Sequence, residues 1–329
     1  MRIAHFSDLH VLSLEGVGWK RFLNKRLTGI ANLALRRAPI DELSGLARLA
    51  AEQVPGDWRR KDVHRATYVR AVAREVGRVG VDHVAITGDL TNLSLEAEFS
   101  AAREILEGEL HLRPSEISIV PGNHDVYTRG ALRGRRFTEF FAEYTQSDIT
   151  AGVDVGPGHF PYVKLRGPCA IIGLSSAVPR LPFVAAGEIG VPQLEALARV
   201  LEHPEVQRRT PVILVHHPPE RPSGTMKAVM ESLRDGGRLF ERLRGLRRGL
   251  VLHGHLHRRK QHQLVTDAGS LLVAGAASAS LHHEQTTRMS GFNVYDIDDS
   301  GALVAIDAHV LDPVTGRFHH EPVPEGRWE

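Results

Sequence analysis

The chain has one cysteine, few aromatic residues and almost no net charge. A lone Cys169 cannot form a disulfide within the chain, and the apolar run at 169–174 predicts that its thiol is buried. Aromatic residues make up 6% of the 329, and 41 Lys and Arg against 39 Asp and Glu leave a formal charge of +2. This charge is too small to bind nucleic acid through bulk electrostatics, and the sequence shows no aromatic platform for stacked bases. We therefore expect no nucleic-acid partner.

Long apolar runs are also missing. No segment approaches the roughly 18 consecutive apolar residues of a transmembrane helix. The chain starts on a strand-like segment at 2–6, without the pattern of a signal peptide. These two absences predict a cytoplasmic protein. The hydrophobic share of 42% is ordinary for a globular chain, and the length allows a substantial core.

Strand-like and helical segments alternate through most of the sequence. We predict strands at 2–6, 81–87, 115–120, 169–174, 212–215 and 249–252. Helices are expected at 17–53 with a break at Pro39, and at 63–79, 94–107, 135–146, 192–202 and 225–246, with Ser94 as an N-cap. Shorter strands follow at 261–266, 270–275, 291–297 and 302–310. The pattern predicts one α/β domain over 1–329, with a helical insert at 17–53 and a β-rich tail at 285–329 that packs on its own domain or on a partner.

Five of the predicted strands end in polar clusters. Such ends meet at one edge of a sheet, where α/β folds place their sites. Carboxylate, carboxamide and imidazole groups together suit Mn, Fe or Zn, and seven donors are enough for two ions that share a carboxylate. Any single cluster is also compatible with an ordinary turn, but turns alone do not explain five in series. The metal-ligand candidates are Asp8, His10, Asp89, Asn123, His216, His255 and His257.

These clusters carry the motifs SDLH at 7–10, GDLTN at 88–92, GNHD at 122–125, HHPP at 216–219 and GHLH at 254–257. The series resembles the calcineurin-like metallophosphoesterase family over residues 3 to about 275. The resemblance implies a four-layer α/β/β/α sandwich of two mixed sheets with a binuclear metal site. It implies that one metal is bound by Asp8, His10, Asp89 and His257, and the other by Asp89, Asn123, His216 and His255.

The same resemblance places the remaining GNHD residues, and the chemistry explains why they are needed. His124 would face the substrate beside the metals, with its ring oriented by Asp125. Two cations neutralise phosphoryl oxygens and lower the pKa of a bridging water, and the resulting hydroxide would attack phosphorus in line with the leaving oxygen. A protonated His124 would then stabilise developing charge or protonate the leaving alkoxide. We expect two divalent ions, Mn in preference to Fe or Zn.

The motif details favour one class of substrate. Protein Ser/Thr phosphatases of this family carry Asp-Arg-Gly in the second motif and Glu after Gly-Asn-His, whereas this chain has GDLTN and GNHD. It more closely resembles bacterial class III cyclic-nucleotide phosphodiesterases, which implies hydrolysis of a small phosphodiester. A non-catalytic scaffold with the same fold is the alternative from another class. Such a scaffold should have lost ligands, and here every ligand position is filled.

A basic stretch near the first motif keeps a second substrate open. Residues 16–40 carry six Lys and Arg and no acidic residue, with apolar residues at helical spacing. This pattern is typical of an amphipathic helix at a membrane surface, or of a packed helix with a solvated basic face. The stretch also resembles part of the UDP-2,3-diacylglucosamine pyrophosphatases of lipid A synthesis. The alternative is therefore a lipid-linked nucleotide substrate, with peripheral contact through 17–38 at the inner membrane.

Overall fold

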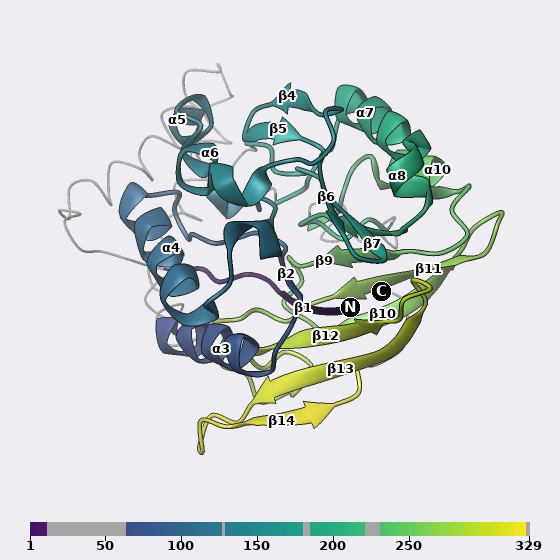
Figure 1. Cartoon of the computed structure of the whole chain (residues 1–329). Helices are drawn as coiled ribbons and strands as arrows, with labels where there is room; N and C mark the ends of the chain where they lie inside the picture. Colours follow the sequence, from purple (N-terminus) through teal and green to yellow (C-terminus); the bar gives the residue numbers. More distant parts are fainter. Residues whose placement is uncertain (12–63, 127–128, 180–184, 221–230, 327–329) are drawn as a thin grey trace, which may run out of the picture.

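The computed structural model describes residues 1–11, 64–126, 129–179, 185–220 and 231–326. In these residues two six-stranded mixed sheets form the centre of the molecule (Figure 1). The first sheet has the order β14 (Phe318–Glu321), β13 (Leu303–Leu311), β12 (Gly291–Ile297), β1 (Arg2–Phe6), β2 (His83–Ile86), β3 (Ile117–Ile119). The second has the order β10 (Lys260–Val265), β11 (Ser270–Gly275), β9 (Leu250–His253), β8 (Thr210–Leu214), β7 (Cys169–Gly173), β6 (Tyr162–Arg166).

Helices cover the outer faces of the two sheets (Figure 1). Helices α3 (Ala66–Arg78) and α4 (Glu96–Leu110) pack on the first sheet, and α7 (Val191–Glu202) and α10 (Gly236–Leu243) pack on the second. The short helices are α5 (Arg129–Arg133), α6 (Arg136–Phe141) and α8 (Pro204–Gln207), and β4 (Val153–Val155) forms a hairpin with β5 (Gly158–Phe160). Short 3₁₀ turns are η1 (Pro114–Glu116), η2 (His124–Val126) and η3 (Ala142–Thr145). The predicted α/β/β/α sandwich is confirmed.

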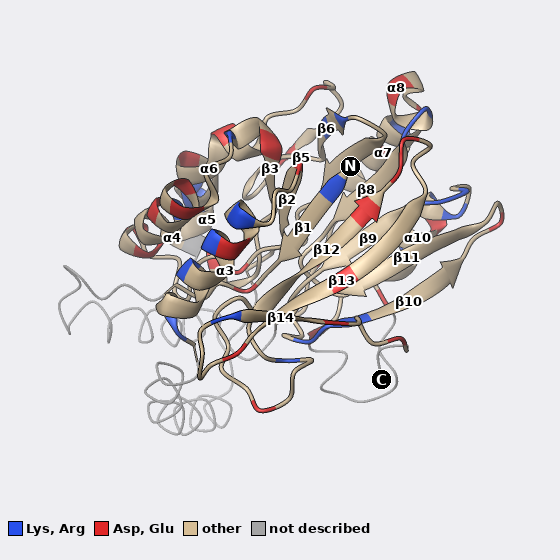
Figure 2. Ribbon diagram, turned by 60° about the horizontal axis from the view of Figure 1, so that its bottom comes forward, with Lys and Arg blue, Asp and Glu red and all other residues tan. Residues whose placement is uncertain are grey.

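Alternating side chains explain why the sheets stack in this way. In β8, Val212 and Leu214 point into the core shared with the first sheet, whereas Ile213 between them packs toward α7 and α10. A strand that is buried on both faces must be apolar on both, as this one is. Charged residues are frequent on the covering helices, and Figure 2 shows acidic and basic positions along the ribbons of α3 and α4. Among them Arg74 pairs with Glu109 at 3.0 Å across these two helices.

The β-rich tail supplies strands of the first sheet. Its strand β12 pairs antiparallel with β1, and His5 lies opposite Asn293. Strands β13 and β14 extend the sheet to its edge. The strand β14, the hairpin β4–β5 and strand β6 were absent from the sequence prediction. The predicted insert at 17–53, with its membrane contact at 17–38, lies outside the described residues.

Two local predictions have clear outcomes. Cys169 is buried and free, and burial raises the pKa of its thiol to about 11. Ser94 is not the N-cap of α4, because the helix starts after Leu95, and Ser94 adopts a left-handed φ of 54°. Its Oγ donates to the carbonyl of His124 at 2.5 Å, so this serine holds the GNHD loop. None of the helices in the described parts of the chain is long and apolar enough to cross a membrane.

Candidate metal centre

The first sheet brings three motifs to one edge. Strands β1, β2 and β3 run parallel, and Phe6, Ile86 and Ile119 lie side by side in register near their ends. The next residues along each strand carry the polar groups of the SDLH, GDLTN and GNHD motifs. Asp8 N donates to the carbonyl of Gly88 and His10 N to that of Asp89, both at 2.9 Å. These loops are therefore fastened to each other beyond the strands.

The second sheet contributes the histidines. Strands β8 and β9 are parallel, with Leu214 opposite Leu252. His216 follows β8, and His255 and His257 follow β9. The backbone N–H of His255 donates to Asp8 Oδ2 at 3.0 Å, which joins the ends of the two sheets. All seven predicted donors are thus gathered at one place.

One group of donors surrounds Asp8. His257 Nε2 lies 3.2 Å from Asp8 Oδ1 and 3.1 Å from His10 Nε2. His10 Nε2 lies 3.9 Å from Asp8 Oδ1 and 3.8 Å from Asp89 Oδ2. An ion with bonds of 2.0–2.2 Å places its ligand atoms about 3.0–3.5 Å apart. The four side chains have nearly this spacing.

The other group surrounds His216. Its Nε2 lies 3.1 Å from Asn123 Oδ1, 3.4 Å from Asp89 Oδ2 and 3.2 Å from His255 Nδ1. Its second nitrogen, Nδ1, lies 2.6 Å from the carbonyl of Thr87. This contact fixes Nδ1 as the protonated donor and leaves the Nε2 lone pair for a metal. Asp89 Oδ2 belongs to both groups, as a bridging ligand must.

The backbone conformation of the candidate metal ligands determines the direction of their side chains. Asp8, His10, Asp89, His255 and His257 all have φ between 44° and 70°, in the left-handed region. This conformation is unfavourable for a residue with a Cβ, by about 1–2 kcal/mol per residue. Five strained residues at one site show that the surrounding fold, rather than local preference, sets the direction of the donors.

Glycine at two positions permits the loops to approach. A Cβ on Gly122 would overlap Asp89 Oδ1, and one on Gly254 would overlap Ser7 Oγ and lie 2.6 Å from Asp8 Oδ2. Each glycine therefore lies against a candidate metal ligand from a different motif. The Gly-Asn and Gly-His pairs of the sequence are explained by this packing.

The carboxylates are held in their charged form. Burial acts to raise the pKa of Asp8, but the imidazoles of His257 and His216 outweigh it and hold this pKa below its ordinary value. Burial likewise opposes ionisation of Asp89, and His216 and His124 keep its pKa well below the usual range. Asp8 Oδ1 is buried and accepts no hydrogen bond. A buried anionic oxygen without a hydrogen bond fits a position next to a cation.

Two of the candidate imidazole ligands are held neutral, whereas at His216 the charge of Asp89 outweighs burial and raises the pKa to about 9. Burial and the nearby His64 hold the pKa of His10 well below its ordinary value. Burial and His216 lower the pKa of His255 to about 3. A neutral imidazole is the form that binds a metal, and at 3.1–3.2 Å these rings point nitrogen atoms at one another. Anionic carboxylates facing converging imidazole nitrogens form a donor set that fits divalent ions.

His124 lies beside both groups, with its ring oriented by a backbone carbonyl. Its Nδ1 lies 2.7 Å from the carbonyl oxygen of Asn92, and its ring centroid lies 4.9 Å from that of His10. The predicted role of Asp125 in orienting this ring is therefore corrected. The orienting group is the carbonyl of Asn92, because its oxygen occupies the position beside Nδ1.

Asp125 instead ties two loops together. Its carboxylate accepts from the N–H groups of Gly122 at 2.9 Å, Thr91 at 3.0 Å and Leu90 at 3.3 Å, and from Thr91 Oγ1 at 3.0 Å. Burial, followed by the charge of Asp89, raises its pKa to about 7. Asp125 is thus a positioning residue that holds Asn123 and His124 against the loop of Asp89.

Replacing Asp125 with asparagine tests this positioning. The amide NH₂ would face backbone donors where an oxygen now accepts, and each lost hydrogen bond in a buried site costs about 1–3 kcal/mol. We expect a lower unfolding temperature and metal affinity reduced about 10–100-fold, as for other groups that support metal ligands. Thermal denaturation and metal titration measure both effects. Asp154→Asn, at an exposed carboxylate on β4, is the control. Unchanged metal affinity in Asp125→Asn would contradict the role.

His64 belongs to the same cluster and was missed by the sequence prediction. Its ring centroid lies 4.7 Å from that of His10 and 5.5 Å from that of His257, and its Nδ1 lies 2.7 Å from Ser280 Oγ. It precedes α3, and the sequence before it, WRRKDV at 58–63, is not an apolar run, so no local pattern marks it. Its backbone forms an antiparallel bridge with Leu281, a contact between distant segments that holds it at the site.

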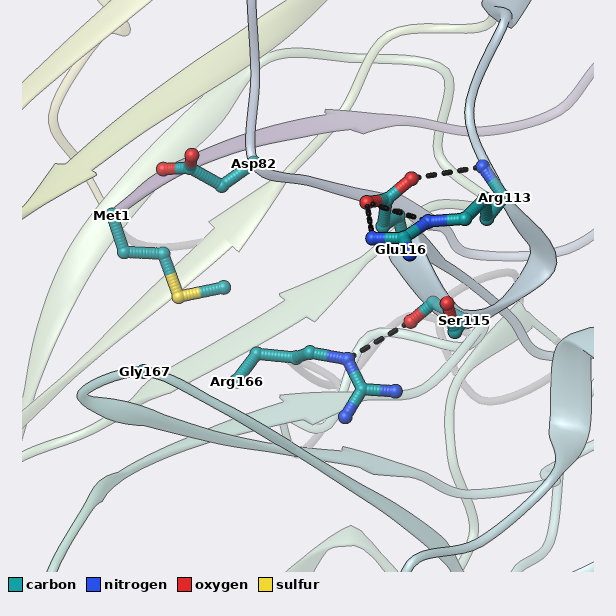
Figure 3. A pocket seen from close by; sticks show the side chains of 7 residues that line it. All are labelled: Met1, Asp82, Arg113, Ser115, Glu116, Arg166 and Gly167. Carbon is teal, nitrogen blue, oxygen red and sulfur yellow. Dashed lines mark hydrogen bonds and ion pairs between the residues drawn. The ribbon is translucent and has the colours of Figure 1, made fainter.

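A surface hollow lies at the opposite end of the strands (Figure 3). Met1 precedes β1, Asp82 precedes β2 and Glu116 precedes β3, and all three line it. The Glu116 carboxylate pairs there with Arg113 at 2.5 Å. None of the seven donors lines this hollow. It is therefore separate from the candidate metal centre.

Comparison with known proteins now identifies the class. The model of the calcineurin-like phosphoesterase family matches residues 1–259. The chain therefore belongs to this family and is a metal-dependent phosphoesterase, a hydrolase. It is 25% identical over 262 residues to a "probable cyclic nucleotide phosphodiesterase" of Rhodococcus erythropolis. The alignment covers 75% of this chain and 78% of that protein.

Solved structures agree on the fold. A dimetal phosphatase from Danio rerio superposes with a TM-score of 0.52 at 11% identity, over 90% of this chain and 92% of that one. A purple acid phosphatase from yellow lupin superposes with a TM-score of 0.54 at 12% identity, over 97% of this chain and 52% of that one. At these identities the likeness concerns the architecture alone.

Proposed function

We propose that this protein is a binuclear phosphodiesterase. One ion would be held by Asp8, His10, Asp89 and His257, and the other by Asp89, Asn123, His216 and His255. The observation that carries the proposal is the position of Asp89 Oδ2, 3.8 Å from His10 Nε2 in one group and 3.4 Å from His216 Nε2 in the other. When bound, the ions supply Lewis acidity toward phosphoryl oxygens and acidify a water at neutral pH.

Two side chains of the protein have further proposed roles in the reaction. Asn123 contributes a neutral oxygen, which keeps positive charge at the site for an anionic substrate. The Nδ1 of His124 lies 2.7 Å from the carbonyl oxygen of Asn92, so the ring nitrogen proposed to carry the transferable proton is Nε2. A proton on Nε2 can be donated to the leaving alkoxide, and the carbonyl stabilises the imidazolium that carries it.

Manganese is the proposed metal, with iron or zinc as alternatives. The donor set combines two carboxylates, one carboxamide oxygen and four imidazoles, which binds several first-row divalent ions. A mixed set with this much nitrogen argues against calcium or magnesium, which prefer oxygen alone.

A small phosphodiester, such as a cyclic nucleotide, is the proposed substrate. The GDLTN and GNHD motifs support it, as does the likeness to the Rhodococcus protein. The structure adds one reason why these motifs occur together. Thr91 Oγ1 and Thr91 N of GDLTN bond the Asp125 carboxylate of GNHD, both at 3.0 Å.

The substrate class is tested by an activity panel on the full chain. The protein is stripped with EDTA, reloaded with Mn, Fe or Zn, and assayed with p-nitrophenyl phosphate, bis(p-nitrophenyl) phosphate, cyclic AMP and UDP-2,3-diacylglucosamine. We expect no turnover without metal, and kcat/KM for a diester at least about tenfold above the monoester, a ratio that a well-placed contact supplies. Faster turnover of the monoester would contradict the proposal. Cleavage of the pyrophosphate bond of the lipid nucleotide in preference to both diesters would replace it with the lipid-linked alternative.

A further inference from the structure

A second group of metal-binding side chains lies on the edge strands of the first sheet. Asp307 and His309 are two residues apart on β13 and therefore share a face, and His309 lies opposite His320 of β14 in register. His309 Nε2 is 3.5 Å from Asp307 Oδ2, and His320 Nδ1 contacts the same oxygen. The ring centroids of the two histidines are 4.2 Å apart. One ligand atom from each residue lies within 4.8 Å of the others.

This group is separate from the candidate metal centre. Strand β12 lies between β13 and β1, and the donors of the catalytic site follow β1 and its neighbours (Figure 1). Two charged groups outside the cluster act on His309: Glu75 of α3, which is paired with Arg78 at 2.6 Å, and Arg2 of β1, which is paired with Asp296 at 3.0 Å. The cluster thus has one carboxylate and two imidazoles of its own.

The geometry suits a transition metal. Two imidazoles and one carboxylate bind Zn, Co, Ni or Cu, with bonds of about 2.0–2.2 Å and ligand atoms about 3.0–3.5 Å apart. The separation of His309 Nε2 and Asp307 Oδ2 already has this value, at 3.5 Å. His320 contacts Asp307 directly, and its side chain is 66% exposed, so an ion can reach this pair from solvent.

His309 is prepared as a ligand. Its ring is buried and stacks on Phe292, with centroids 4.5 Å apart and planes inclined by 18°. The stacked ring therefore has a fixed position, with its Nε2 3.5 Å from Asp307 Oδ2. One fixed buried ligand beside two more exposed ones gives both a preformed anchor and a route of entry from solvent.

We propose that Asp307, His309 and His320 form a separate site for one divalent transition-metal ion, with zinc as the expected occupant, and that the ion fastens β14 to β13. β14 has four residues and pairs only with β13 in the described sheet. A short edge strand has few hydrogen bonds to hold it. A bond from each strand to one ion supplies the missing constraint.

Zinc stoichiometry of the full chain tests the proposal. Protein is dialysed to equilibrium against buffered zinc, and bound zinc per chain is measured by atomic emission. His320→Ala is the informative variant, because its exposed side chain is not needed for packing. His319→Ala is the matched control: it is the adjacent histidine of the same strand, and it contacts Glu321 at 3.1 Å instead.

We expect wild type and His319→Ala to bind one zinc more than His320→Ala, with the same phosphoesterase activity in all three. Cobalt substitution supplies a second readout, since the visible bands of the additional ion should be missing from His320→Ala alone. Equal zinc content in wild type and His320→Ala would overturn the proposal and leave the cluster as an Asp–His ion pair. Loss of the same zinc in His319→Ala would also overturn it, because binding would then not depend on the triad.

Discussion

Replacing Asp89 with asparagine is expected to lower kcat/KM by at least about 10³-fold and to reduce the metal bound at the candidate metal centre from two ions to one or none. Each tenfold loss of rate corresponds to about 1.4 kcal/mol of activation free energy. Metal ions stabilise the charge of the transition state by several kcal/mol, so their loss accounts for an effect of this size. Asp89 Oδ2 lies 3.8 Å from His10 Nε2 in one group of donors and 3.4 Å from His216 Nε2 in the other, so loss of its charge weakens both. Steady-state kinetics and metal analysis of the same preparations measure the two effects together.

Asparagine is the informative substitution because it preserves the fold. Asp89 has a φ of 53° and accepts from the N–H of His124 at 2.8 Å. Asparagine tolerates the left-handed conformation and retains an oxygen for that bond. The matched control is Asp82→Asn, at the other end of β2, where an exposed carboxylate accepts from Arg2 N at 2.7 Å. Full activity and the metal content of wild type in Asp89→Asn would refute a bridging role.

His124→Ala is expected to lower turnover by about 10²–10⁴-fold, the usual contribution of a positioned acid or base. Metal content should remain that of wild type, because the seven proposed ligands are complete without this ring. The combination distinguishes the variant from Asp89→Asn, in which metal content falls. The control is His159→Ala, at an exposed histidine of β5.

The leaving group separates acid catalysis from simple charge stabilisation. A p-nitrophenolate leaves without protonation, whereas a ribose alkoxide is strongly basic and needs a proton. If His124 is the acid, His124→Ala should lose much more activity toward cyclic AMP than toward bis(p-nitrophenyl) phosphate. An equal loss on both would assign His124 to charge stabilisation or positioning. Wild-type rates on both would exclude any catalytic role.

Much of the fold could be predicted from local patterns. Strand β1 at Arg2–Phe6 and helix α7 at Val191–Glu202 agree with the expected 2–6 and 192–202. Their apolar spacing is fixed by burial on a sheet or helix face, which the sequence records directly. The N-cap at Ser94 failed because the hydroxyl bonds the carbonyl of His124, a partner 30 residues away. Strand β14 was missed because its sequence Phe-His-His-Glu lacks apolar alternation, and its place is set by pairing with β13.

For the candidate metal centre, too, local sequence patterns predicted one part and the tertiary structure was needed for the rest. By itself the sequence determined which donors are present and that each follows a strand, because a strand and the polar turn at its end are neighbours along the chain. It also carried the glycines at 122 and 254, which the close packing of the loops requires.

Only the tertiary structure decided which atoms face one another. In the structure the carbonyl of Asn92 orients the ring of His124, and the carboxylate of Asp125 accepts hydrogen bonds from the GDLTN loop. The ring of His64 lies beside that of His10. The physical reason is that these contacts join segments that are far apart in the sequence, such as the bridge between His64 and Leu281, and that only the folded chain brings together. A hydrogen bond between loops depends on distances that no local pattern of residues encodes.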